Sequence, residues 1–150
     1  MNKINGLDLL LVEDNPQDLE LTLRALQKGQ LEDHTQVARD GVEALEYIFC
    51  EGAHAERSQA DNPRLVLLDL KLPKLDGLQV LKRIKGDPRT RHIPVVVLTS
   101  SKEQRDLEES LQLGVNSYIV KPVNIERFAE AMRDLALYWL LLYHEPKGDG

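Results

Sequence analysis

The chain has few of the features that mark secreted, membrane or zinc-binding proteins. It contains one cysteine, Cys50, which cannot form a disulfide within the chain and which we expect to be a packing residue. This cysteine usage favours a reducing compartment, so we expect a cytoplasmic protein. No stretch approaches the length of a membrane span, and the apolar run from Leu9 to Val12 is too short for a secretion signal. The histidines show no spacing typical of a zinc site.

Positive charge is also in deficit. The sequence has 19 Lys and Arg residues against 25 Asp and Glu residues, and its formal net charge of −6 argues against nucleic acid as a partner. The segment from Lys82 to His92 is a local exception, for which we expect a solvated basic face, with a docking surface as the alternative. A length of 150 residues with 42% hydrophobic residues suits one globular domain.

The chain does contain a regular alternation of apolar runs and amphipathic segments. Apolar or β-branched runs predict strands in segments 7–12, 35–38, 65–69, 93–98 and 115–120. Apolar residues at helical spacing predict helices around Leu19 to Leu26, Val42 to Phe49, Leu78 to Ile84, Leu107 to Leu111 and Ile125 to Trp139. The polar segment from Glu51 to Pro63 predicts an exposed loop that is partly helical at its start.

Five strand–helix repeats are typical of an α/β protein in which helices cover both faces of a parallel sheet. If the strand order is 2-1-3-4-5, the first and third strands are neighbours, and ligands bind at the carboxyl ends of the strands where the order reverses. We expect a single domain over residues 1–150, with its core between about residues 7 and 143. Since only residues 145–150 follow the last predicted helix, we expect no output domain.

The stretch from Leu65 to Gly77 contains the first candidate functional residue. Its apolar run is typical of a strand buried on both faces, and the run ends abruptly in the carboxylate of Asp69. Pro73 and the pair Asp76-Gly77 predict that the chain turns at once. Asp69 is thereby predicted at the edge of the sheet where ligands bind, although an aspartate after a strand is often only a turn residue.

Other predicted strands also end in polar residues, namely Glu13-Asp14, Thr99 and Lys121. The strand order would bring Glu13 and Asp14 next to Asp69. Two carboxylates about 4 Å apart repel by roughly 4 kcal/mol at an effective dielectric constant near 20, so such a cluster shares protons or holds a cation. Oxygen ligands of this kind suit Mg²⁺.

A carboxylate beside Mg²⁺ and a lysine is an arrangement suited to phosphoryl transfer. Asp69 would attack the phosphorus atom, Lys121 would neutralise the phosphoryl oxygens and Thr99 could donate a hydrogen bond. Each residue also has a structural explanation: an acid before a helix, a helix cap or a solvated lysine. Their coincidence at the ends of four strands favours the functional interpretation.

Four motifs resemble those of two-component response-regulator receiver domains. They are Val12-Glu13-Asp14-Asn15, the segment from Leu68 to Gly77, Leu98-Thr99-Ser100, and the segment from Tyr118 to Pro122. The resemblance covers essentially the whole chain. It implies a flavodoxin-like (βα)5 three-layer sandwich with a five-stranded parallel sheet of order 2-1-3-4-5.

The resemblance also implies how the site works. Asp69 is the residue that accepts a phosphoryl group from a histidine kinase. Asp14 binds Mg²⁺ directly, Glu13 acts on it largely through water, and the backbone carbonyl of Lys71 is a further ligand. On this basis the chain is a signalling protein rather than an enzyme, with self-phosphorylation and slow autodephosphorylation as its intrinsic chemistry.

A conformational switch is implied as well. Thr99 and Lys121 contact the phosphoryl group, and Tyr118 is the aromatic residue that turns inward when Thr99 moves toward the phosphate. The Lys121–Pro122 peptide bond is expected to be cis.

More narrowly, the chain is similar to the stand-alone regulators of bacterial phytochrome histidine kinases. This similarity implies a phytochrome-type kinase as the partner. Two alternatives remain open. A phosphatase of the haloacid-dehalogenase type would need a second aspartate two residues after Asp69, where Lys71 stands. A receiver-like protein without phosphotransfer is disfavoured by the complete set of site residues.

The last predicted helix carries a long apolar stretch from Ala136 to Tyr143. A surface helix normally has one apolar stripe, so apolar residues all round indicate burial on several sides or a partner. We expect a homodimer through the fourth helix, fifth strand and fifth helix, with the helix end folding back on its own core as the alternative. The predicted interface residues are Tyr138, Trp139, Leu142 and Tyr143.

Overall fold

The fold was established from a computed structural model, which describes residues 8–28, 35–58, 62–100 and 104–132. Five parallel strands form one sheet in the order β2-β1-β3-β4-β5, which confirms the predicted flavodoxin-like topology. The strands are β1 (Leu9–Val12), β2 (Thr35–Ala38), β3 (Leu65–Asp69), β4 (Val95–Thr99) and β5 (Ser117–Val120). Each begins or ends within two residues of its predicted bounds.

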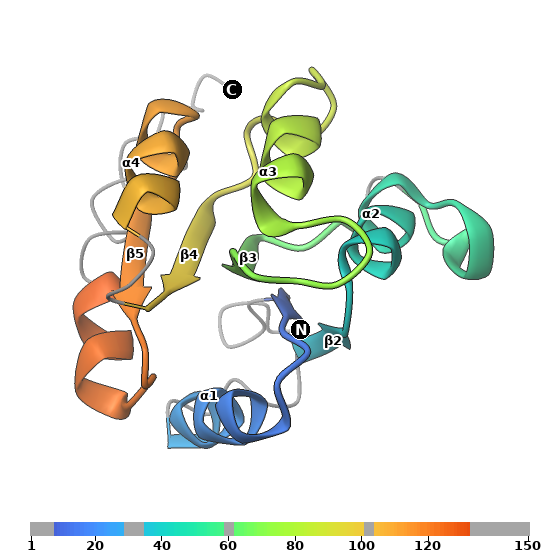
Figure 1. The fold of residues 1–150 in the computed structure, drawn as a ribbon. Helices are drawn as coiled ribbons and strands as arrows, with labels where there is room; N and C mark the ends of the chain where they lie inside the picture. The colour runs from blue at the N-terminus through green and yellow to red at the C-terminus, as the bar shows by residue number, and fades with distance from the viewer. Residues whose placement is uncertain (1–7, 29–34, 59–61, 101–103, 133–150) are drawn as a thin grey trace, which may run out of the picture.

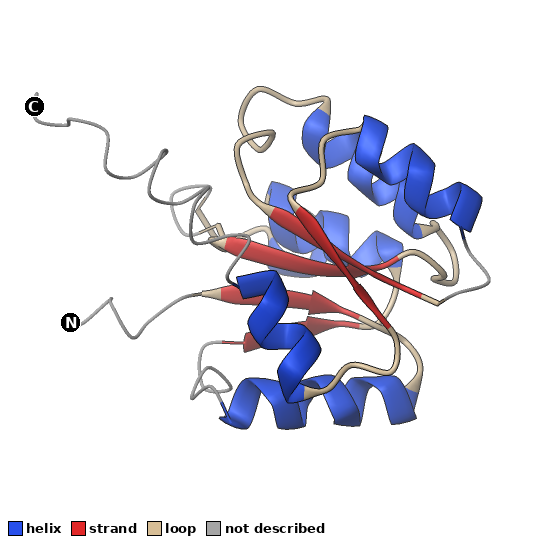
Figure 2. Ribbon diagram, turned by 90° about the vertical axis from the view of Figure 1, so that its left-hand side faces the viewer, coloured by secondary structure: helices blue, strands red, loops and turns tan. Residues whose placement is uncertain are grey.

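Helices cover both faces of this sheet, as Figures 1 and 2 show. They are α1 (Pro16–Lys28), α2 (Gly41–Phe49), α3 (Gly77–Lys85) and α4 (Gln104–Gln112), with a short 3-10 helix, η3 (Gly52–His54), after α2. A further helix begins at residue 125 and is described as far as residue 132. Within the described residues, no helix is long and apolar enough to span a bilayer.

The two faces of the sheet bury two separate apolar cores, because successive side chains of a strand point to opposite faces. On one face Leu10 and Val66 pack with α2 and α3. On the other face Leu11 and Leu67 pack with α1 and the helix that begins at residue 125. Strands β1, β3 and β4 are buried along their whole length, so the continuous apolar runs were correctly interpreted as central strands.

Three apolar residues of the predicted helix faces lie at the surface instead. Val42, Leu111 and Ile125 are between 41% and 47% exposed. Their spacing correctly predicted helices, but spacing does not specify how far a neighbouring element covers the edge of an apolar stripe. In α4 the buried residue is Ser110, whose hydroxyl donates a hydrogen bond to the Leu107 carbonyl.

The loop after α2 is largely exposed and begins with η3, as predicted. Cys50 closes α2 in the left-handed conformation, with φ of 56°, and is partly exposed rather than packed in a core. Arg57 anchors the loop, because its guanidinium lies 3.7 Å from the centre of the Tyr47 ring and donates to the Tyr47 carbonyl. These contacts with α2 hold the loop in place, although the hydrophobic periodicity of the sequence does not define its conformation.

The basic segment from Lys82 to His92 is engaged in contacts with its own surroundings. Lys82 lies 3.7 Å from Glu109, and Arg89 forms an ion pair of 2.9 Å with Asp87. Lys85 donates to the carbonyls of Arg91 and Ile93. These contacts support a structural role for much of this charge.

Candidate phosphoryl-acceptor site

Carboxylates from two adjacent strands converge at the carboxyl edge of the sheet. Asp69 is the last residue of β3, and Glu13 follows β1 directly; both side chains are buried. Asp14 is exposed beside them, and one oxygen of each of the three carboxylates lies within 4.8 Å of the others. The pairing of Val12 with Leu68 brings these residues together, since it places the ends of β1 and β3 side by side. The predicted acidic cluster is therefore formed.

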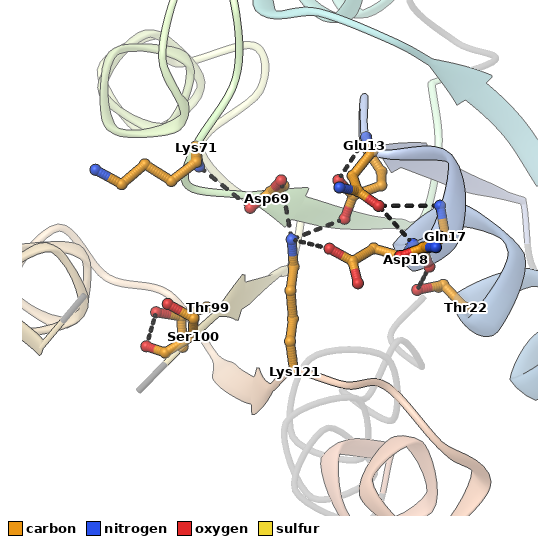
Figure 3. A network of polar contacts seen from close by, with 10 residues as sticks. Glu13, Gln17, Asp18, Thr22, Asp69, Lys71, Thr99, Ser100 and Lys121 are labelled. Atoms are coloured by element: carbon orange, nitrogen blue, oxygen red, sulfur yellow. Dashed lines mark hydrogen bonds and ion pairs between the residues drawn. The ribbon is translucent and has the colours of Figure 1, made fainter. Parts of the chain in front are cut away.

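Lys121 extends from the end of β5 into this cluster (Figure 3). Its Nζ lies 3.0 Å from Glu13 Oε2, 3.1 Å from Asp69 Oδ2 and 3.0 Å from Asp18 Oδ2. The Lys121 side chain is only 15% exposed, so its ammonium neutralises charge in a partly desolvated setting. The Lys121–Pro122 peptide bond is cis, as expected.

Backbone amides hold the two buried carboxylates in place. Asn15 N–H donates to Glu13 Oε1 over 3.1 Å, and Lys71 N–H donates to Asp69 Oδ1 over 3.1 Å. Each carboxylate therefore has one oxygen held by the backbone and the other facing Lys121. Such fixed donors orient the carboxylates before any ligand arrives.

The loop from β3 to α3 approaches Asp69 so closely that a side chain at Gly77 would not fit. A Cβ there would overlap the Asp69 carbonyl oxygen and lie 2.6 Å from Leu70 Cα. Gly77 N–H instead donates to the Leu70 carbonyl, and Asp76 caps α3 through Gln79 N–H. The Asp76-Gly77 pair that predicted a turn thus also allows the start of α3 to pack against the end of β3.

Burial and neighbouring charges shift the pKa values of Glu13 and Lys121 in this cluster. Burial raises the pKa of Glu13 from 4.5 to about 8, with help from a hydrogen bond to Asp69 and from the negative charge of Asp69. Burial opposes the charge of Lys121, but the attraction of Asp69 and Glu13 outweighs it and raises the pKa of the ammonium above its ordinary value. Without a cation, Glu13 is therefore largely protonated near neutral pH, and Lys121 stays charged.

This pKa makes the stability of the metal-free protein depend on pH. Because the folded state binds the Glu13 proton more tightly than the unfolded chain, its contribution is complete below pH 4.5 and is lost as the pH rises through about 8. We expect the free energy of unfolding to fall by on the order of 3 kcal/mol over this range through Glu13 alone. Glu13→Gln should remove most of that fall.

The measurement is denaturant unfolding in a chelator at pH 5 and pH 8, for the wild type and Glu13→Gln. Glu20→Gln is the control, because Glu20 is exposed and pairs only with its helical neighbour Arg24 among the contacts of the described chain. An equal loss of stability in the wild type and Glu13→Gln would show that Glu13 is not the titrating group.

The donor set fits a hard divalent cation. Glu13 Oε2 is buried and receives no well-directed hydrogen bond from the described residues, although the Lys121 ammonium lies 3.0 Å from it. Three carboxylate oxygens within 4.8 Å, one of them on an exposed residue, offer ligands while leaving room for water. The set contains no sulfur or imidazole, which suits Mg²⁺ better than zinc.

Thr99 and Tyr118 occupy the two remaining predicted positions. Thr99 ends β4, between the strands that carry Asp69 and Lys121, and its hydroxyl donates to the Ser100 carbonyl over 3.2 Å. Its backbone carbonyl accepts from Lys121 N–H over 2.7 Å. Tyr118 lies on β5 and is 46% exposed. The switch of Thr99 and Tyr118 stays a prediction, as does the role of the Lys71 carbonyl.

Asp18 was not predicted as part of this site. It lies in the first turn of α1, where an acidic residue is common because it favours the positive end of the helix. Its contact with Lys121 spans 103 positions of sequence. The sequence signal for it is an acidic residue four positions after Asp14, in the first turn of the helix that follows.

The fold and this site define a receiver domain of the response-regulator class. Residues 9–133 match the model of the response regulator receiver domain family, and the chain belongs to that family.

Among solved structures, the chain is similar to the bacteriophytochrome response regulator AtBRR, with 55% identity and a TM-score of 0.78 over 88% of this chain and 94% of that one. It is also similar to the bacteriophytochrome response regulator RtBRR, with 49% identity and a TM-score of 0.79 over 85% and 76% of the two chains.

A curated relative, response regulator Rcp1 of Synechocystis sp., is 36% identical over 88% of each chain. The solved Mn²⁺-bound form of Rcp1 covers 91% of this chain and 94% of its own, with 34% identity and a TM-score of 0.71.

Proposed function

We propose that this protein is a single-domain response regulator that accepts a phosphoryl group on Asp69 from a histidine kinase. The observation that carries the proposal is the contact of Lys121 with both buried carboxylates, beside an exposed third carboxylate. This arrangement supplies a nucleophile, a fixed positive charge and oxygen ligands at one point of the sheet edge.

The chemistry follows from the positions of these groups. Asp69 Oδ2 or Oδ1 attacks the phosphorus atom of a phosphohistidine, a new O–P bond forms and the N–P bond breaks, with the electron pair going to the imidazole nitrogen. Lys71 N–H holds one Asp69 oxygen, and Lys121 faces the other. The ammonium then neutralises the charge of the phosphoryl oxygens, and the Thr99 hydroxyl is the candidate donor to a further oxygen.

Glu13, Asp14 and Asp69 would hold Mg²⁺, which supplies a positive charge that screens the carboxylates and the incoming phosphoryl group from each other. The carbonyl of Lys71 is the further ligand that we propose. Support comes from the donor set described above and from Rcp1, a relative whose structure with Mn²⁺ has been solved.

The proposed kinase partner is of the phytochrome type. Two similar solved structures are bacteriophytochrome response regulators, and both are more similar in sequence to this chain than Rcp1 is. We further propose that the protein acts in the cytoplasm as a signalling protein rather than an enzyme. The phosphatase alternative gains no support, because Lys71 occupies the position of the second acid and its ammonium lies 3.7 Å from Asp106.

The homodimer stays a prediction. Its residues Tyr138, Trp139, Leu142 and Tyr143 lie outside the described residues. The exposed apolar side chains of Leu111 on α4 and Tyr118 on β5 are compatible with the proposed interface of the fourth helix, fifth strand and fifth helix.

The test of the proposed function is phosphoryl uptake by the wild-type chain. Intact mass is measured after incubation with acetyl phosphate, with Mg²⁺ or with a chelator, and after incubation with an autophosphorylated phytochrome-type kinase. We expect one added phosphoryl group that requires the cation. No uptake from either donor would favour a receiver-like protein that acts without phosphotransfer.

A further inference from the structure

Lys121 has a carboxylate partner that lies outside the candidate metal-binding group. Asp18 Oδ2 is 3.0 Å from Lys121 Nζ, whereas the group of converging carboxylates consists of Glu13, Asp14 and Asp69. Figure 3 shows Asp18 reaching the ammonium from the first turn of α1. The ammonium therefore has one partner that the proposed chemistry does not use.

The other two partners change their bonding during phosphoryl transfer. Asp69 forms a covalent bond to phosphorus through one of its oxygens, and Glu13 belongs to the group that would face the cation. Both must exchange at least part of their contact with Lys121 for new contacts. Asp18 takes part in neither event, so its contact with the ammonium can persist throughout.

The backbone of Asp18 is held by two hydrogen bonds. Its backbone N–H donates to Asn15 Oδ1 over 2.9 Å, and its carbonyl accepts from the hydroxyl of the fully buried Thr22 over 2.9 Å. The same Asn15 donates its backbone N–H to Glu13. The segment from Glu13 to Asp18 therefore supplies two of the carboxylates that contact the ammonium.

We propose that Asp18 is a positioning residue for phosphoryl transfer, which keeps the Lys121 ammonium at the acceptor site while Glu13 and Asp69 exchange partners. This inference rests on the proposed function, since it concerns the same site. A lysine ammonium on its four-carbon stem has many orientations, and a fixed anionic partner reduces the reorganisation that precedes the reaction. Asp18 acts through Lys121 and touches no reacting atom, so its loss slows the reaction without abolishing it.

The test compares Asp18→Ala with Glu20→Ala, a matched removal of an exposed acid from the same helix. Alanine has the highest helix propensity, so neither change threatens the folding of α1. The rate of phosphoryl uptake is measured over a range of acetyl phosphate concentrations with Mg²⁺. We expect the maximal rate to fall about tenfold in Asp18→Ala, with little change in the half-saturating concentration. Glu20→Ala should match the wild type, and Asp18→Glu should restore most of the rate.

The direction of the change in uptake rate distinguishes a positioning role of Asp18 from the effect of its negative charge alone. Removal of a negative charge by itself would favour an anionic phosphodonor and would raise uptake or lower the half-saturating concentration. A merely structural role for Asp18 would lower the unfolding temperature and leave the maximal rate unchanged.

A second readout needs neither phosphodonor nor cation. NMR spectra of the ¹⁵N-labelled lysine ammonium groups should show a Lys121 signal in the wild type, assigned by its absence in Lys121→Arg. We expect this signal to weaken in Asp18→Ala and to persist in Glu20→Ala.

An unchanged maximal rate in Asp18→Ala overturns the inference, whatever the spectrum shows. Wild-type protein that takes up no phosphoryl group from either donor overturns the proposed function and the inference with it. Normal wild-type uptake beside an unaffected Asp18→Ala variant overturns the inference alone.

Discussion

Asp69→Asn is expected to abolish phosphoryl uptake from both acetyl phosphate and a phosphorylated kinase. The substitution keeps the volume of the side chain, but a neutral amide is a poor nucleophile and forms no acyl phosphate. Asp69 is 2% exposed at the end of a central strand, so the substituted side chain stays at the same point of the site. Intact mass with time is the measurement.

The same variant should fold well. Asp69 raises the pKa of Glu13 by a hydrogen bond and by its charge, so a neutral residue at position 69 relieves repulsion in the metal-free cluster. Loss of uptake therefore cannot be attributed to unfolding if the denaturation midpoint is maintained. Asp106→Asn removes a nearby carboxylate that faces Lys71 and serves as the control, with uptake retained. Uptake by Asp69→Asn at the wild-type rate would place the acceptor on another residue.

Lys121→Met is expected to lower the rate of uptake by about a hundredfold or more, since removal of one preorganised charged donor from a reacting oxyanion typically has this effect. The methionine retains much of the length of the lysine stem but leaves Glu13, Asp18 and Asp69 without their shared ammonium. Uptake kinetics at saturating Mg²⁺ are the measurement. A rate equal to that of the wild type would remove Lys121 from the phosphoryl-binding site.

Loss of the Lys121 ammonium should also lower the free energy of unfolding of the Lys121→Met variant. Breaking a buried ion pair by removing one partner typically costs about 3 to 5 kcal/mol. Mg²⁺ should therefore stabilise this variant more than it stabilises the wild type, because the cation replaces the missing positive charge. Lys71→Met is the control, since the Lys71 side chain is 64% exposed and its ammonium lies 3.7 Å from its acidic partner Asp106.

Much of the architecture was predictable because it depends on local patterns. Continuous apolar runs such as Leu65–Leu68 can be buried on both faces only in a central parallel strand, and the structure confirms this position. Parallel strands end at one edge of the sheet, so the polar residues that follow them had to meet there. Together with the strand order 2-1-3-4-5, this rule predicts that Glu13, Asp14 and Asp69 meet, and the structure confirms it.

The tertiary structure decided which carboxylates contact the Lys121 ammonium and whether Glu13 is protonated. Asp18 is an ordinary acidic residue of a first helical turn in the sequence, and only the packing of α1 beside the end of β5 brings it to Lys121. Likewise, Glu13 and Asp14 are adjacent carboxylates in the sequence, and only the burial of Glu13 in the fold raises its pKa to about 8. Burial and contacts between distant segments arise from the packed fold, and local sequence patterns do not specify either of them.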